Sequence, residues 1–230
     1  MFVTQLRENA DGTIEYAIPS AGYNAEMDRY EDNDDIIIRG EQAEKAVSAL
    51  NASSSLTITR NAETGKLSAT GKAKGKADIL PLKAINDENI TVELETTSAQ
   101  LYDSKDGTKN IPLLPGGFEG STINNDGTVT ATQFLNVENA KVISSVIGEE
   151  PGETIRHELN KSYLGAVKNP GGNYGSAYET AHKAAAKVDG IAHPQLQFNE
   201  DRSRSPHIFQ IRKTGTTVWK DLGPKTKMKR

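Results

Sequence analysis

The chain has 230 residues, a length typical of one good-sized domain or two small ones. It carries 27 Lys and Arg against 31 Asp and Glu, and the resulting net charge of −4 argues against a dedicated nucleic-acid-binding protein. The absence of cysteine excludes disulfides, thiolate nucleophiles and Cys-ligated zinc. Wholly apolar runs such as Ile36–Ile38 are far shorter than the ~20 residues that cross a bilayer, so we expect no membrane span.

Composition divides the chain into three segments. We expect an acidic, irregular N-terminal segment over residues 1–40, an α+β domain over 41–195, and a C-terminal extension with a basic tail over 196–230. The N-terminus shows no basic region followed by an apolar stretch, so no Sec signal is predicted. The expectation is a chain that is cytoplasmic as made, with export by a specialised secretion system or packaging in a virion as further routes.

The first half of the chain shows mainly strand patterns. Apolar residues three and four apart predict a helix over 41–52, and strict alternation over 89–96 predicts the clearest strand. Pro81 is expected to interrupt a short helix or turn over 77–85. Further predicted elements are a strand over 35–39, a hairpin formed by 56–59 and 66–70, and a strand over 128–135. Residues 103–127 are predicted to form a long ordered loop or a pair of irregular edge strands.

Two helices dominate the second half. The first is predicted over 151–168, where Pro151 and acidic residues suit the first turn and Asn169-Pro170-Gly171 ends it. The second is predicted from Ser176 to about residue 188, with Ser176 and Glu179 forming a capping box. The fold class is therefore expected to be α+β, with an antiparallel sheet backed by helices and a helical pair that carries the candidate site.

Histidines and carboxylates gather on this helical pair. His157 and Glu158 lie near the middle of the first helix, Glu179 and His182 lie three residues apart on the second, and His193 follows. Antiparallel packing of the two helices would bring His157 and His182 face to face. A metal-assisted hydrolase needs two or three imidazole or carboxylate ligands, an open position for water, and a carboxylate base. Candidate metal ligands are His157, His182 and either Glu179 or His193, with Glu158 as the base.

The segments Thr154–Ala166 and Ala177–His182 resemble the active-site helices of small zinc-metallopeptidase-like domains. Such domains occur at the C-terminal ends of Rhs-type polymorphic toxins and in secreted effector peptidases. The resemblance implies zinc as cofactor, His157 and His182 as ligands, and Glu158 as the general base. Tyr163 would either stabilise an oxyanion or pack.

One residue departs from the zincin pattern. The motif His-Glu-x-x-His places its second imidazole four residues after the first, where this chain has Lys161. An ammonium cannot ligate while protonated, so either the metal uses other ligands with Lys161 turned outward, or the site is degenerate. The first hypothesis is a metallopeptidase-like effector or cargo protein acting on a protein or peptide substrate. The alternative is a non-catalytic structural or interaction protein that binds protein partners, such as a phage virion or contractile secretion system component or cargo.

Overall fold

The computed structural model describes residues 36–189, apart from residue 75, together with seven short strands outside that range. On the N-terminal side of residue 36, β1 (Leu6–Glu8) pairs with β2 (Ile14–Tyr16), and β3 (Tyr23–Asn24) pairs with β4 (Arg29–Tyr30). On the C-terminal side of residue 189, β13 (Gln195–Phe198), β14 (Phe209–Arg212) and β15 (Lys220–Leu222) form an antiparallel sheet. Most of the predicted segments 1–40 and 196–230 therefore lies outside the described residues.

The central sheet has four strands in the order β11-β12-β8-β5. They are β5 (Ile36–Gly40), β8 (Ile90–Thr96), β11 (Gly116–Ile123) and β12 (Val129–Leu135). β12 and β5 both run parallel to β8, and only β11 pairs antiparallel with its neighbour. The predicted antiparallel sheet is therefore wrong for two of the three pairings. The reason is that intervening elements return the chain to the end of the sheet where it started, as parallel pairing requires.

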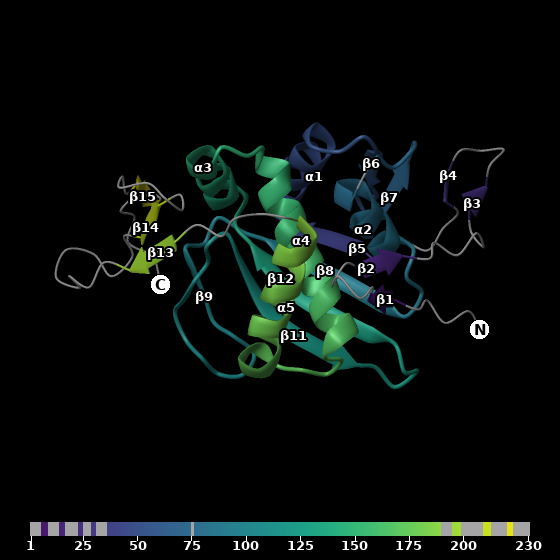
Figure 1. Cartoon of the computed structure of the whole chain (residues 1–230). Helices are drawn as coiled ribbons and strands as arrows, with labels where there is room; N and C mark the ends of the chain where they lie inside the picture. Colours follow the sequence, from purple (N-terminus) through teal and green to yellow (C-terminus); the bar gives the residue numbers. More distant parts are fainter. Residues whose placement is uncertain are drawn as a thin grey trace.

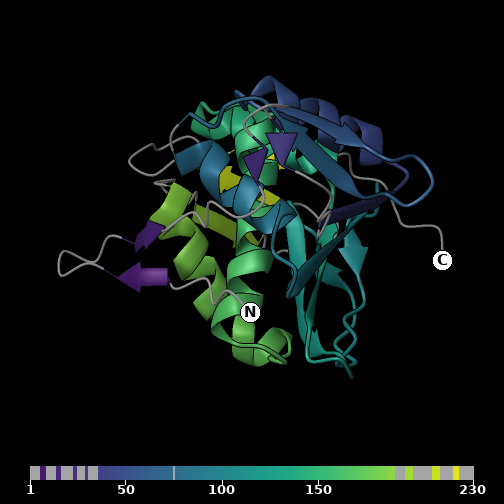
Figure 2. The same ribbon diagram turned by 90° about the vertical axis from the view of Figure 1, so that its right-hand side faces the viewer.

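In the part of the chain that the structure describes, five helices accompany this sheet, which confirms the α+β class with a sheet backed by helices. They are α1 (Ala43–Ala52), α2 (Lys76–Ile85), α3 (Val137–Ile147), α4 (Pro151–Lys168) and α5 (Tyr174–Asp189). α4 is the central one, since it contacts β8, β11 and β12 as well as the other four helices (Figure 1). The view turned by 90° shows α4 and α5 on one side of the sheet (Figure 2).

The periodic patterns form the core as predicted. Ile90, Val92 and Leu94 are buried on one face of β8. The predicted hairpin is present as β6 (Thr57–Arg60) and β7 (Leu67–Thr70), with β4 added beside β7. α2 continues through Pro81, so the expected interruption is not present. Residues 103–127 contain the short strand β10 (Ile111–Pro112), which pairs with β9 (Leu101–Tyr102), and the long edge strand β11.

One helix lies outside the prediction, and another begins earlier than predicted. α3 was not predicted, although Asn136 is its N-cap and accepts a hydrogen bond from the backbone N–H of Asn139 at 3.0 Å. Gly148 ends α3 in the left-handed conformation, at φ 78°. α5 begins at Tyr174, so Ser176 lies inside the first turn and is not the predicted N-cap.

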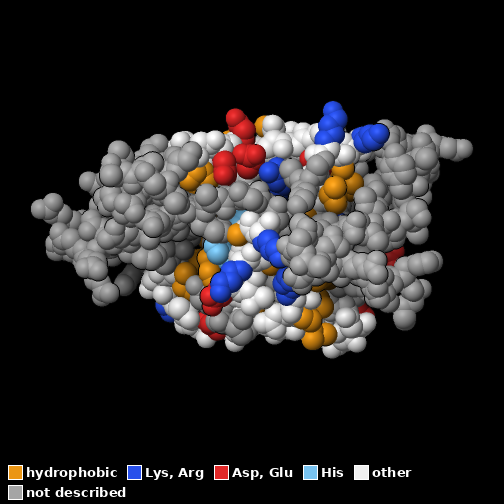
Figure 3. Space-filling model, in the orientation of Figure 1, with side chains coloured by type: hydrophobic (Ala, Val, Ile, Leu, Met, Phe, Trp, Pro, Cys, Tyr) orange, Lys and Arg blue, Asp and Glu red, His pale blue; other side chains and the backbone are white. Residues whose placement is uncertain are grey.

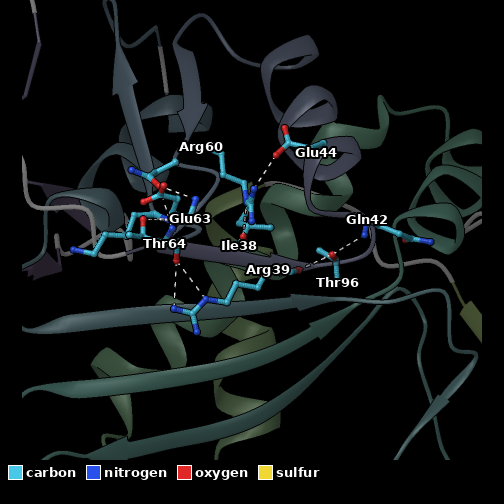
Figure 4. Close-up of polar contacts among 10 residues, drawn as sticks. Ile38, Arg39, Gln42, Glu44, Arg60, Glu63, Thr64 and Thr96 are labelled. Carbon is cyan, nitrogen blue, oxygen red and sulfur yellow. Dashed lines mark hydrogen bonds and ion pairs between the residues drawn. The ribbon is translucent and has the colours of Figure 1, made fainter.

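Polar contacts fix β5 at the sheet edge (Figure 4). The hydroxyl of Thr96 donates to the carbonyl of Arg39 at 2.6 Å and accepts from the backbone N–H of Gln42 at 3.0 Å. Nε of Arg60 donates to the carbonyl of Ile38 at 2.6 Å. β5 is therefore part of the central sheet, although the predicted domain starts only at residue 41.

Candidate functional site

α4 is buried over most of its length. Fourteen of its 18 residues are buried, and these include Arg156, His157, Glu158 and Lys161. A helix that is buried all round is normally apolar, because burying a polar group costs free energy unless it is hydrogen-bonded. The charged residues of α4 must therefore be satisfied inside the protein, and their partners define the candidate site.

Glu158 and Lys161 satisfy each other. The Lys161 ammonium forms an ion pair with Oε2 of Glu158 across one turn of α4, and the two side chains are 1% and 4% exposed. Lys161, at the position of the second zincin imidazole, thus points inward to the predicted general base. The alternative in which Lys161 turns outward is wrong, because a nearly buried Glu158 carboxylate requires a counter-ion.

A strand of the sheet completes the polar network. Nε2 of Gln133, on β12, donates to Oε2 of Glu158 at 2.6 Å, and the hydroxyl of Ser162 donates to Oε1 of Gln133 at 2.8 Å. A Cβ at Gly116, on β11, would overlap both the Glu158 carboxylate and the Gln133 amide. The carboxylate therefore lies against the β11 backbone and accepts hydrogen bonds from fixed donors.

Three aromatic rings lie beside this ion pair. The rings of His157 and His182 meet edge to face, with centroids 5.5 Å apart and planes at 89°. Tyr178 stacks on His182 with centroids 5.6 Å apart, and the Lys161 nitrogen lies 5.2 Å from the Tyr178 ring centroid. We call His157, Glu158, Lys161, Tyr178 and His182 the α4–α5 polar cluster.

The cluster is closed on the α4 side and partly open on the α5 side. His157 is 6% exposed, whereas Tyr178 and His182 are half-buried. Figure 3 shows histidine side-chain atoms at the surface of the face on which α5 lies. Any molecule reaching the cluster from this face would meet α5 residues before it met Glu158.

Two of the predicted site residues lie elsewhere. Glu179 is 79% exposed and pairs with Lys183 at 2.7 Å, and this hydrogen bond lowers the pKa of Glu179. The buried side of α5 is formed by alanines such as Ala177 and Ala181, which leaves Glu179 on the solvent side of the helix. Tyr163 is fully buried and its hydroxyl donates to Asp87 at 2.6 Å, so it packs rather than serving an oxyanion.

The described residues do not fit a zinc ion. Among them, no group of three or more His, Asp or Glu side chains is placed to hold a metal. His157 and His182 are adjacent, but the third position on the same side is filled by the Lys161 ammonium. His193 lies outside the described residues. The zinc cofactor therefore stays a prediction.

Sequence reasoning missed Gln133 and Ser162. Gln133 lies in the inward-facing row of β12, between Ala131 and Leu135, all three of which are buried. A glutamine in an otherwise apolar row is a signal that a polar partner lies opposite. Its partners are about 25 to 29 residues away in the sequence, which hides the contact from local patterns.

Comparison with models of known protein families, with curated proteins and with solved structures gave no match. Among the described residues, no helix combines the length and the apolar character that crossing a membrane requires.

Proposed function

We propose that the chain is a non-catalytic structural or interaction protein, whose helical pair has the layout of a metallopeptidase site without a working metal centre. The observation that carries this proposal is the buried ion pair between Lys161 and Glu158. A metallopeptidase base must be available to take a proton from a metal-bound water. In this chain, the carboxylate at that position is neutralised by a side chain of its own helix.

Electrostatics support the same conclusion. A protonated lysine a few ångströms away repels a divalent cation, and it offers no lone pair for coordination. The Gln133 amide also binds Oε2 of Glu158, so the oxygen that faces the lysine already accepts two hydrogen bonds. The site is thus organised as a polar contact between α4 and β12. The chain would then act through protein partners, as a component or cargo of a larger assembly.

Metal content and hydrolysis test this function together. We expect protein purified without an affinity tag to contain far less than one equivalent of zinc, and wild type and Glu158→Gln to show the same background hydrolysis of an unfolded protein substrate. One equivalent of zinc, together with hydrolysis that disappears in Glu158→Gln, would contradict the proposal. Circular dichroism of both proteins controls for folding.

A second candidate is the zinc metallopeptidase itself, because one observation favours it. The imidazoles of His157 and His182 are in contact, and His182 is reachable from the surface. Two imidazoles are half of a tetrahedral zinc site, and His193 is the remaining predicted ligand. Under this candidate, His193→Ala would remove bound zinc from the wild-type protein, whereas under the first candidate it would leave the metal content unchanged and near zero.

A further inference from the structure

We infer that the Lys161 ammonium is the built-in cation of the α4–α5 polar cluster, and that residue 161 alone decides whether this cluster binds a divalent metal. This inference deepens the proposed function and rests on it. It gives the cluster a ligand class, namely borderline divalent cations such as Zn²⁺ and Co²⁺, and names the one side chain that excludes them.

The contacts of Lys161 place its charge at the centre of the cluster. It forms an ion pair with Glu158 and lies 5.2 Å from the ring centroid of Tyr178. Tyr178 stacks on His182, and His182 in turn contacts His157. Since residues four apart share a helix face, His157 and Lys161 also lie on the same side of α4. Position 161 therefore faces the same space as the two imidazoles.

Charge balance explains why ammonium and metal exclude each other. The Glu158 carboxylate is almost fully buried, and a buried carboxylate needs a cation nearby. Lys161 supplies that cation from the same helix. A divalent ion at the imidazoles would have to displace it or accept a second positive charge a few ångströms away. In the wild-type cluster, Lys161 and Glu158 thus balance each other's charge without a metal.

Substitution of Lys161 changes both the charge of the cluster and the number of its metal ligands. Lys161→His removes the competing charge and adds a third imidazole on the same side of α4 as His157. Together with His182, three nitrogen donors would then face one space, which is the ligand number of catalytic zinc sites. Glu158 would lose its ammonium partner and provide a negative charge that favours cation binding. Imidazole ligands suit Zn²⁺ and Co²⁺.

The test is a titration of the full-length chain with Co²⁺, followed by visible absorption, and with Zn²⁺, followed by metal analysis after dialysis. We expect Lys161→His to bind about one equivalent, with affinity at least tenfold higher than wild type. Adding His182→Ala to Lys161→His should lower this affinity by at least roughly tenfold, because loss of a direct ligand should cost no less than loss of an outer-shell partner, which typically costs 10–100-fold. Glu158→Gln combined with Lys161→Met is the matched control, since it removes both charges, adds no ligand and should bind no more metal than wild type.

A second variant covers the case in which Lys161→His does not fold. Lys161→His combined with Glu158→Gln keeps the third imidazole and leaves no buried carboxylate without its counter-ion, and its melting temperature should rise on addition of Zn²⁺. Metal binding by either variant at the level of wild type, with the protein folded, would overturn the inference and leave the proposed function standing. One equivalent bound by wild type would also overturn it, and the hydrolysis comparison of wild type with Glu158→Gln would then decide separately whether the proposed function fails.

Discussion

Lys161 and Glu158 are buried together, and this arrangement is costly for each residue alone. Removing a carboxylate and an ammonium from water costs several kcal/mol per ion, which their mutual attraction offsets only when the geometry is good and further hydrogen bonds are made. Here Gln133 supplies such a bond to Glu158 at 2.6 Å. The pair therefore adds little net stability, but it makes each charge depend strongly on the other.

This dependence predicts that removing one of the two charges lowers the free energy of unfolding strongly, whereas removing both lowers it little. Lys161→Met should lower the free energy of unfolding by about 3–5 kcal/mol, because it leaves the Glu158 carboxylate buried without its counter-ion. Combining Lys161→Met with Glu158→Gln should recover most of that loss. Urea unfolding followed by circular dichroism measures both values.

An exposed ion pair on the neighbouring helix provides the control. Lys183 and Glu179 are 74% and 79% exposed, so Lys183→Met should cost less than about 1 kcal/mol. Equal losses for Lys161→Met and Lys183→Met would show that the buried pair is not coupled as described.

A second buried carboxylate, Asp78, makes stability depend on pH. Burial raises its pKa, but hydrogen bonds from the Ser54 and Ser55 hydroxyls and from the backbone N–H groups of Lys74 and Ser55 outweigh this and lower the pKa below its ordinary value of 3.8. A folded-state pKa below the unfolded one means that the unfolded chain binds the proton more readily. Asp78 therefore stabilises the fold above the unfolded pKa, and this contribution is lost as pH falls through the lower folded pKa.

Asp78→Asn should thus be less stable than wild type by about 1–3 kcal/mol at neutral pH, because charge-assisted hydrogen bonds are lost. The difference should narrow as the pH falls below about 4. Urea titrations at several pH values measure this trend, with Glu63→Gln on the exposed turn as a control. A difference that stays constant down to pH 2 would contradict the assigned role of Asp78.

Elements with a clear period were predictable, whereas side-chain partners and strand directions were not. α4 spans the predicted range, and the meeting of His157 with His182 follows from antiparallel packing of α4 and α5. Gln133 and Gly116, which lie against the Glu158 carboxylate that Lys161 pairs with, are remote in the sequence. Parallel pairing of β8 with β5 and β12 likewise depends on the path of the intervening chain, which periodicity does not encode.

The sequence of α3 carries its own local helix signals. Apolar residues at Val137, Ala140, Ile143 and Ile147 form one buried face, between the N-cap Asn136 and the terminating Gly148. These are ordinary helix start and stop signals. The segment lies between the strand predicted over 128–135 and the helix predicted over 151–168.

Close packing of α4 against α5 and β11 gives a prediction at the level of elements. A Cβ at Gly165 would lie 2.6 Å from Cζ of Phe118 and 3.0 Å from Cβ of Ala181. Overpacking in Gly165→Ala should cost about 1–3 kcal/mol, against a gain in helix propensity of ~1 kcal/mol, so we expect a net destabilisation of up to about 2 kcal/mol.

A substitution of Phe118 tests whether its contact with the added Cβ causes the destabilisation by Gly165→Ala. Phe118→Leu alone should destabilise through lost packing, but Gly165→Ala should cost less when Phe118→Leu is present, because the ring no longer occupies the space. Thermal or urea unfolding of the two single variants and the double variant gives this coupling. Strict additivity would show that the effect of Gly165→Ala does not come from the Phe118 contact.

At the scale of the whole molecule, α4 links most of the described core. It packs against three strands of the central sheet and against all four other helices. Such a helix cannot open while its neighbours remain in place, because its burial is shared among them. The loop over 103–110 is different: most of its residues are exposed, and Glu119 anchors it through the Ser104 hydroxyl and the backbone N–H of Lys105.

Native-state hydrogen exchange should therefore show different free energies of opening for α4 and for the loop over 103–110. Amides of α4 and β8 are expected to exchange only through global unfolding, and those of residues 103–110 through local opening at much lower free energy. In Lys161→Met, α4 and β8 should lose protection by the same amount, equal to the loss measured in urea, while the loop stays unchanged. Faster exchange of α4 than of β8 in wild type, or loss of protection confined to α4 in the variant, would show that the helix opens independently and that the buried ion pair stabilises α4 alone.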